Sequence, residues 1–200
     1  MSSHSQTYQD VTDPGEIKSL LSSSNDLQGF GGVDVKITDM VDERSALVGG
    51  YGGVLINRSY MLGLGAYGIV NGPSFEGLAP GIEDSTQLSL YGGYGGLLLG
   101  GTLFAKEMLH ISLPLFLGAG NLEVSDDDFF QGIGDTSFTV ESSVFFVVEP
   151  SLQLEFNITS YLRIAGGASY RWVRGLELTN VTDDQVTGFS GILSVRLGRF

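Results

Sequence analysis

The fold is decided in the second half of the chain, by the stretch 141-ESSVFFVVEPSLQLEFN-157. Apolar residues occupy every second position from Val144 to Phe156, and polar residues that include Glu149 and Glu155 occupy most positions between them. Because side chains alternate between the two faces of a β-strand, the stretch predicts a strand with one apolar face and one polar face. Such a strand separates an apolar environment from a polar one.

After a short break at 158–160 the alternation resumes in 161-YLRIAGGASYRW-172, with Arg163 and Arg171 on the polar side. The two stretches predict a β-hairpin whose polar faces carry opposite charges. If three residues form the turn, Glu155 lies directly opposite Arg163 in a cross-strand pair.

Eight segments from residue 27 onward carry strand-like patterns. They span residues 27–39, 43–57, 60–70, 86–104, 108–120, 138–157, 161–174 and 186–200. Together with the breaks between them, these segments predict an all-β fold, an eight-stranded antiparallel up-and-down transmembrane β-barrel. The barrel domain is expected to cover residues 27–200.

The breaks between the segments differ in length in a regular way. After a short first break at 40–42, tight breaks alternate with long acidic ones. The tight breaks are 57–59, 105–107 and 158–160, and the long ones are 71–85, 121–137 and 175–185. Outer-membrane barrels have short turns at one end and long loops at the other, and an even strand number places both chain ends at the short-turn, periplasmic end. The sequence therefore predicts acidic loops on the outside of the cell.

Composition excludes several classes of protein. Hydrophobic residues make up 42% of the chain, but no stretch approaches the roughly 20 apolar residues of a membrane-spanning helix. The absence of cysteine excludes a disulfide scaffold and a Cys-based zinc site. A net charge of -13 excludes DNA and RNA as partners, because nucleic-acid phosphates repel an acidic chain.

Residues 1–26 differ from the rest of the chain and are rich in Ser, Asp and Gln. We expect a flexible or partly helical periplasmic tail, with a short helix around 16–23. The tail lacks the basic start and the apolar run of a signal peptide. Because an outer-membrane barrel is exported, we expect the sequence to be a mature form; a cytosolic protein is the alternative.

A glycine-rich repeat supports a barrel built from hairpins. The run 46-ALVGGYGGVL-55 recurs as 89-SLYGGYGGLL-98, and neither copy ends in the Gly-Lys-Ser/Thr of a phosphate-binding loop. Two interpretations of the glycines stay open: they let the wall curve, or they form a partner-facing flank on which another membrane protein packs. The residues of this flank are Gly49, Gly50, Gly52, Gly53, Gly92, Gly93, Gly95 and Gly96.

Three segments carry a resemblance to a known group: 149-EPSLQLEFNITSYLRIAGGASYR-171, 49-GGYGGVLIN-57 and 191-GILSVRLGRF-200. They are similar to small outer-membrane barrels of Bacteroidota-type bacteria, which have the OmpA/OmpX-like transmembrane barrel superfold. The resemblance covers about residues 29–200. It implies an eight-stranded barrel located in the outer membrane, and it carries over no catalytic residues.

The terminal Phe200 resembles the signal that barrel-assembly machinery recognises. Alternate positions before it, however, hold Gly198, Arg196 and Ser194 rather than apolar residues. Either Phe200 lies beyond the lipid-facing residues, or assembly uses a variant signal. The strand pattern itself does not depend on this residue.

The polar faces of the predicted strands point into the barrel. Eight strands leave an interior that side chains fill, so we predict a filled polar lumen rather than an open pore; a narrow gated channel is the alternative. Tyr51, Tyr91, His110 and Ser112 are expected to face inward. Buried charges must pair, and the expected inward charges have both signs. This lumen charge network consists of Asp34, Lys36, Glu149, Glu155, Arg163, Arg171 and Arg196.

An outer-membrane lipid-modifying enzyme is a further alternative, because His110-Ile111-Ser112 resembles the His-x-Ser of lipid A deacylase barrels. Both polar side chains are expected to point inward near the short-turn end, and Glu123 is expected in a loop rather than on the next strand. A catalytic triad needs its base and nucleophile within hydrogen-bond reach, with a third group to orient the base. We therefore predict no catalytic residues and no enzymatic activity.

The long loop after residue 120 carries Asp126-Asp127-Asp128 beside Phe129 and Phe130. The acidic run lacks the spacing of a calcium-binding loop, so we predict no metal site and no cofactor. Adjacent exposed aromatic side chains at a loop tip indicate contact with a partner or a membrane. The expected partners are outer-membrane lipid or lipopolysaccharide, and another outer-membrane protein or a periplasmic subunit.

A soluble lipocalin-like ligand carrier is the main alternative fold, since it also has eight up-and-down strands but keeps its apolar side chains inside. The unequal loops and the aromatic residues near the strand ends favour the membrane barrel. The sequence thus predicts an integral outer-membrane barrel that acts as a structural, accessory or interaction subunit.

Overall fold

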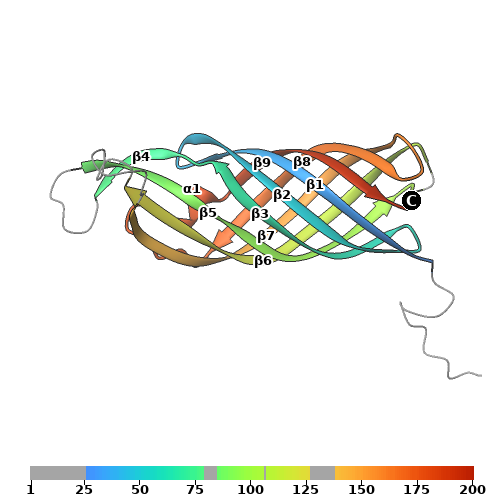
Figure 1. Cartoon of the computed structure of the whole chain (residues 1–200), viewed down its shortest axis with the longest axis horizontal. Coiled ribbons are helices and arrows are strands. Elements are labelled where there is room, and N and C mark those ends of the chain that lie inside the picture. The colour runs from blue at the N-terminus through green and yellow to red at the C-terminus, as the bar shows by residue number, and fades with distance from the viewer. Residues whose placement is uncertain (1–25, 79–84, 106, 127–137) are drawn as a thin grey trace, which may run out of the picture.

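The computed structural model describes residues 26–78, 85–105, 107–126 and 138–200. These residues form nine strand segments and one short helix (Figure 1): β1 (Leu27–Met40), β2 (Glu43–Ile56), β3 (Tyr60–Asn71), β4 (Ser74–Leu78), β5 (Ser85–Leu103), β6 (Leu109–Asp126), β7 (Phe138–Asn157), β8 (Leu162–Arg174), α1 (Asp183–Val186) and β9 (Gly188–Gly198). All the strand pairings are antiparallel. No helix among these residues is long and apolar enough to span a membrane.

The strands close into a ring. They follow in the order β3-β2-β1-β9-β8-β7-β6-β5-β4, and β3 also pairs with β5. β3 and β4 together occupy one strand position of the barrel, because both pair with β5. Gly68 of β3 lies opposite Gly93, and Ser74 of β4 lies opposite Ser89. Pro73, which has no N–H to donate, interrupts them. The structure is therefore a closed eight-stranded up-and-down barrel, as predicted, with the start of β1 and the C-terminus at the same end (Figure 1).

Several segments predicted as loops contain regular structure. β4 lies within the predicted loop 71–85, and α1 begins within the predicted loop 175–185 and ends at Val186, the first residue of the predicted last strand. β6 was predicted to end at residue 120 but continues to Asp126, so Glu123 lies on a strand opposite Ser142 and not in a loop. The period-two pattern of the strand continues past Asn121 and Glu123, where the sequence predicts a loop. The predicted tail, up to residue 25, lies outside the described residues.

The hairpin between β7 and β8 has a wider turn than predicted. Glu155 lies opposite Ala165, so the prediction that it lies directly opposite Arg163 is wrong by two positions. The Thr159 hydroxyl accepts two backbone N–H groups within the turn, at 3.1 and 3.2 Å, which accommodates the additional residues. Because side chains alternate with a period of two, the shift leaves Glu155 and Arg163 on the same face, inside the barrel.

Burial alternates along the strands in the sense opposite to that of a soluble barrel. On β7 the side chains of Glu149 and Glu155 are fully buried, whereas Phe146 and Leu152 are 68% and 56% exposed. The lipocalin-like alternative is therefore wrong, because it requires apolar side chains inside. An apolar outer wall around a polar interior is the arrangement of a barrel that lies in lipid.

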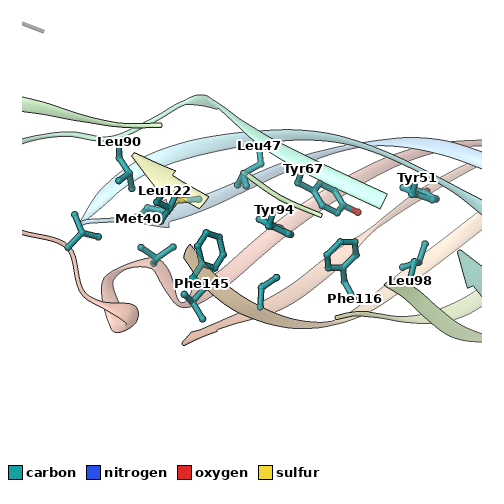
Figure 2. Packing of buried hydrophobic residues seen from close by; sticks show 14 of the residues in the cluster. Met40, Leu47, Tyr51, Tyr67, Leu90, Tyr94, Leu98, Phe116, Leu122 and Phe145 are labelled. Carbon is teal, nitrogen blue, oxygen red and sulfur yellow. The ribbon is translucent and has the colours of Figure 1, made fainter. Parts of the chain in front are cut away.

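At the long-loop end the polarity of the two faces of the wall changes. The inward positions of β5, β6 and β7 there hold Leu90, Leu122 and Phe145, which are buried in one apolar cluster (Figure 2). Outward positions beside Leu122 and beyond Val144 are polar, and the Ser142 hydroxyl donates to Asn121 Oδ1 at 3.0 Å on the outer surface. This end of the wall is therefore built like a soluble protein, with its apolar side chains inside.

The two glycine runs contain inward-facing and outward-facing positions. Gly49 faces inward, and a Cβ built on it would lie 2.1 Å from Cδ1 of Tyr67 and 2.5 Å from the Ala66 carbonyl oxygen. Gly50 faces outward, where the nearest atom to a built Cβ would be the Gly32 carbonyl oxygen at 3.7 Å. At position 49, then, glycine is needed because the Tyr67 ring occupies the space of a side chain.

This difference predicts opposite outcomes for two neighbouring substitutions. Gly49→Ala is expected to lower the free energy of unfolding by about 1–3 kcal/mol, because the added methyl group overpacks the interior against the Tyr67 ring. Gly50→Ala is the matched control, and we expect a change of less than about 0.5 kcal/mol. Urea titration of the purified barrel in liposomes measures both. Equal losses from the two variants would contradict the assigned directions of these glycines.

Candidate functional site

The interior of the barrel holds the highest concentration of buried polar groups in the described residues. The seven side chains of the predicted lumen charge network all lie inside, none more than 3% exposed. They project from β1, β7, β8 and β9. Ions removed from water need partners, and the structure gathers these residues into two groups along the barrel axis. We call them the mid-barrel cluster (Asp34, Lys36, Glu149 and Arg171) and the turn-end cluster (Glu155, Arg163 and Arg196).

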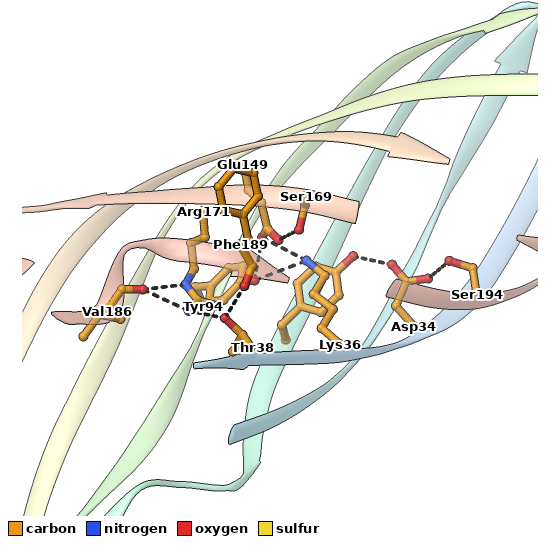
Figure 3. Close-up of polar contacts among 11 residues, drawn as sticks. Asp34, Lys36, Thr38, Tyr94, Glu149, Ser169, Arg171, Val186, Phe189 and Ser194 are labelled. Atoms are coloured by element: carbon orange, nitrogen blue, oxygen red, sulfur yellow. Dashed lines mark hydrogen bonds and ion pairs between the residues drawn. The ribbon is translucent and has the colours of Figure 1, made fainter. Parts of the chain in front are cut away.

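Glu149 is the centre of the mid-barrel cluster (Figure 3). Lys36 Nζ lies 2.9 Å from Glu149 Oε2, and the Tyr94 hydroxyl donates to the same oxygen at 2.6 Å. The Ser169 hydroxyl donates to the other carboxylate oxygen at 2.5 Å. Both oxygens of this fully buried carboxylate are thus hydrogen-bonded, which offsets the cost of removing it from water.

Asp34 lies next to this pair on the inner face of β1. It accepts hydrogen bonds from the hydroxyls of Tyr67, at 2.8 Å, and Ser194. The Lys36 ammonium lies 3.5 Å from the centroid of the Tyr67 ring, so the aromatic face also stabilises the cation. Tyr67 and Tyr94 pack edge-on against Phe116, with ring centroids 5.5 Å apart in each pair. The aromatic rings therefore fill the lumen around the ion pair.

The turn-end cluster holds two guanidinium groups around one carboxylate. Glu155 is hydrogen-bonded to Arg196 Nη1, lies 3.4 Å from Arg163 Nη1, and is 2.8 Å from Nε2 of His110. Arg196 also donates to Gln153 Oε1 and to the Tyr51 hydroxyl, each at 2.6 Å. Arg196 is therefore the most connected member of this cluster.

The C-terminal residue closes the turn end. Phe200 lies beyond β9, half-buried, and its ring centroid is 3.8 Å from Cζ of Arg163. Of the two sequence interpretations of Phe200, the first therefore holds, since the residue does not continue the outward, lipid-facing row that contains Leu193, Val195 and Leu197.

A small cavity separates the two clusters. Its volume is about 10 Å³, which is room for one water molecule. Both clusters contribute to its wall, with Asp34 and Lys36 on one side and Gln153 and Arg196 on the other. The gap is too small for a hydrated ion.

The residues considered for catalysis lie inside the wall of the barrel. His110 and Ser112 are 1% and 0% exposed, and the carboxylate that contacts His110 is Glu155, not Glu123. Within the described residues, the Ser112 hydroxyl and Nδ1 of His110 have no hydrogen-bond partner, so the hydroxyl is not bonded to the histidine. The described residues also contain no group of three or more His, Asp or Glu side chains placed to hold a metal ion.

One inward residue was assigned wrongly. Tyr91 was predicted to face the lumen but is 44% exposed, while Tyr94 is buried and contacts Glu149. The repeat in the sequence contained the signal for the correct assignment, because Tyr94 occupies the position in the second copy that Tyr51 occupies in the first. Tyr67, the other ring beside Lys36, lies between the copies and was not identified.

The predicted partner-facing flank is only partly on the outside. Alternation along the strands places Gly50, Gly52, Gly93 and Gly95 outward. Across the register, Gly50 lies opposite Ala66, Ala66 opposite Gly95, and Gly68 opposite Gly93, so these positions form a band of small residues over β2, β3 and β5. Gly52 lies at its edge, opposite Leu64. The other four glycines of the flank, which do not join this band, are Gly49, Gly53, Gly92 and Gly96. Phe129 and Phe130 lie outside the described residues.

Several solved structures have folds similar to that of this chain. Neisserial surface protein A aligns over 89% of this chain and 100% of its own, with 13% identity and a TM-score of 0.55. The chain shares its barrel fold. The N-terminal β-barrel domain of Pseudomonas aeruginosa OprF aligns over 84% of this chain and 96% of its own, with 10% identity and a TM-score of 0.49. Ail of Yersinia pestis, solved with the heparin analogue sucrose octasulfate, aligns over 87% of this chain and 97% of its own, with 14% identity and a TM-score of 0.46. No family model and no curated protein matches the sequence.

The ion pair in the mid-barrel cluster gives a stability prediction. Lys36→Met is expected to lower the free energy of unfolding by about 3–5 kcal/mol, because it leaves Glu149 buried without its cation. The double variant Lys36→Met/Glu149→Gln removes the uncompensated charge and is expected to recover part of the loss. Urea titrations measure both. The control is Arg44→Gln, which breaks an exposed pair with Asp39 and should change stability by less than about 0.5 kcal/mol. Similar effects of Lys36→Met and Arg44→Gln would contradict a paired lumen.

The turn-end cluster predicts a ranking of its two arginines. Arg163→Leu is expected to lower the unfolding temperature of the detergent-solubilised barrel, and Arg196→Leu to lower it further. The reason is that Arg196 contacts three polar side chains, whereas Arg163 makes one long hydrogen bond to Glu155. The measurement is the temperature at which the folded band is lost on a gel. An unchanged temperature for Arg163→Leu would show that the network does not stabilise the barrel.

Proposed function

We propose that this protein is an integral outer-membrane barrel that passes no solute and acts as a structural or interaction subunit of the membrane. The observation that carries the proposal is the filled lumen, in which paired charges and aromatic rings occupy the cross-section. A cavity of about 10 Å³ between the two clusters supports a closed interior. A barrel that is closed inside acts through its outer wall and its ends.

Location and orientation are part of the proposal. The apolar outer wall supports a place in lipid, and the fold shared with Neisserial surface protein A supports the outer membrane. In this orientation the turn end and both chain ends face the periplasm, and the long acidic loops face outward. The resemblance to Bacteroidota-type barrels of the OmpA/OmpX-like superfold stays a prediction from the sequence. Contact with outer-membrane lipid or lipopolysaccharide, and a periplasmic subunit as a further partner, also stay predictions from the sequence.

An interaction role is favoured over catalysis. His110 and Ser112 are enclosed by the barrel wall, where no lipid substrate reaches them. The band of small residues on β2, β3 and β5 instead gives another membrane protein a place for close packing, since small side chains let two backbones approach. We therefore propose no enzymatic activity and place the partner contact on this band.

Site-specific photocrosslinking in native membranes tests this proposal. A photoreactive residue at position 50, within the band, is expected to form one defined protein adduct that mass spectrometry identifies. The matched control is position 154 on β7, across the ring from the band, where Leu154 is 48% exposed and the expected adducts are with lipid only. The purified barrel in a planar bilayer is expected to carry no current.

Each outcome bears on a separate part of the proposal. The same protein adducts from both positions, or none from position 50, would contradict the assigned partner contact. A steady current through the purified barrel would contradict the closed lumen and favour the narrow channel. Recovery of the protein in the soluble fraction of native cells would contradict the membrane location.

A further inference from the structure

The segment between β8 and β9 folds back into the mouth of the barrel at the long-loop end. It spans residues 175–187 and contains α1, which lies at that end (Figure 1). Val181 and Val186 of this segment are 1% and 2% exposed and belong to the apolar cluster that also contains Met40, Leu47 and Phe145. The two valines therefore fill the top of the lumen.

Hydrogen bonds tie the segment to the rim of the barrel at several points. The Asp183 carboxylate accepts the N–H groups of Gly175 and Leu176, at 3.3 and 2.9 Å, which closes the segment on itself. The N–H of Glu177 donates to the Ser143 hydroxyl on β7 at 2.8 Å. On the other side, the N–H of Val41 donates to the Gln185 carbonyl at 3.0 Å. The segment is thus held between β7 and the turn after β1.

A lumen arginine holds the segment from below (Figure 3). Arg171 donates to the Val186 carbonyl oxygen through Nε at 3.0 Å and Nη2 at 2.9 Å, and to the Thr38 hydroxyl at 3.3 Å. It is the one cation of the mid-barrel cluster that forms no ion pair within the described residues. A buried guanidinium needs hydrogen-bond acceptors, and the Val186 carbonyl oxygen accepts two of the three hydrogen bonds that Arg171 donates. The hydrogen bonding of this buried guanidinium therefore depends on the segment remaining in place.

We propose that residues 175–187 form a plug that closes the outer mouth of the lumen, and that Arg171 is the latch that holds the plug. The inference deepens the proposed function, because it names the element that separates the closed lumen from the outer solution. When the latch is removed, the plug leaves the mouth and water reaches the layer of the lumen that contains Arg171, Thr38 and Ser45. The strands below that layer stay paired.

Cysteine labelling tests the plug, because the chain contains no cysteine of its own. Ser45→Cys is an isosteric reporter: Ser45 lies opposite Thr38, is fully buried and has no hydrogen-bond partner within the described residues. In the otherwise unchanged barrel, a charged maleimide is expected to label it slowly. Adding Arg171→Leu is expected to raise the labelling rate at least about tenfold, since the lost hydrogen bonds involve a charged group.

A second variant and two controls keep the test decisive. Asp183→Ala removes the acceptor that keeps the plug folded on itself, without altering a lumen charge, and is expected to act in the same direction, so the proposal stays testable if Arg171→Leu does not fold. Arg174→Leu removes a neighbouring arginine whose pair with Asp184 is exposed, and should leave the rate unchanged. A reporter at the turn end, Ser112→Cys, should stay unreactive in every variant.

Three results would overturn the proposal. Rapid labelling of Ser45→Cys without further substitution would show an open mouth. An unchanged rate with folded Arg171→Leu and Asp183→Ala would show that neither residue holds a plug. Equal acceleration at Ser45→Cys and Ser112→Cys would show loosening of the whole barrel. None of these readouts uses current or crosslinking, so a failure of the proposed function is recognised separately.

Discussion

The structure depends on one constraint: a barrel with an apolar outer wall must find partners inside itself for its buried charged side chains. Burying an ion costs several kcal/mol unless partners surround it, and the inward positions of β1, β7, β8 and β9 carry ions of both signs. Glu149 meets the constraint with one cation and two hydroxyls, and Glu155 meets it with two guanidinium groups and His110. Arg171 meets it without a carboxylate, through a backbone carbonyl and a hydroxyl. The lumen is filled because each of these ions needs several partners within reach.

Glycine makes room for the aromatic rings that share the lumen with these ions. A Cβ at position 32 would lie 2.6 Å from the Tyr51 hydroxyl oxygen, and one at position 49 would overlap the Tyr67 ring. The same two tyrosines hydrogen-bond Arg196 and Asp34, one from each cluster. Gly32 and Gly49 therefore support the charge network, because they leave room for the tyrosine rings that contact it. Gly50, which faces outward, has no comparable packing reason, since the nearest atom to a built Cβ there would be 3.7 Å away, whereas at outward Gly93 a Cβ would lie 2.3 Å from the Tyr67 carbonyl oxygen.

What could be predicted from the sequence was the part of the structure that depends on local alternation. The period of two fixes which residues share a face, and this placed all seven charged residues inside. It does not fix register, so the hydroxyl of Thr159, which widens the turn, made the direct pairing of Glu155 with Arg163 wrong. The plug at 175–187 carries no period, and its position depends on contacts with β7, β8 and the turn after β1. Tertiary contacts of this kind leave no pattern in the sequence.

The change in polarity of the outward and inward side chains along the wall indicates where the lipid ends. On β7, outward positions are apolar from Phe156 back to Val144, and Ser142 is the first polar one. On the inner side the change runs the other way, from charged residues to Leu122 and Phe145. A wall that reverses both faces within a few residues has passed from lipid to water, because each face must match its surroundings. The apolar cluster and the plug therefore lie in the part of the barrel that projects into water, where apolar burial stabilises the fold as it does in a soluble protein. The plug belongs at this end because its valines need that apolar cluster, and Arg171 is the point where the polar lumen below meets it.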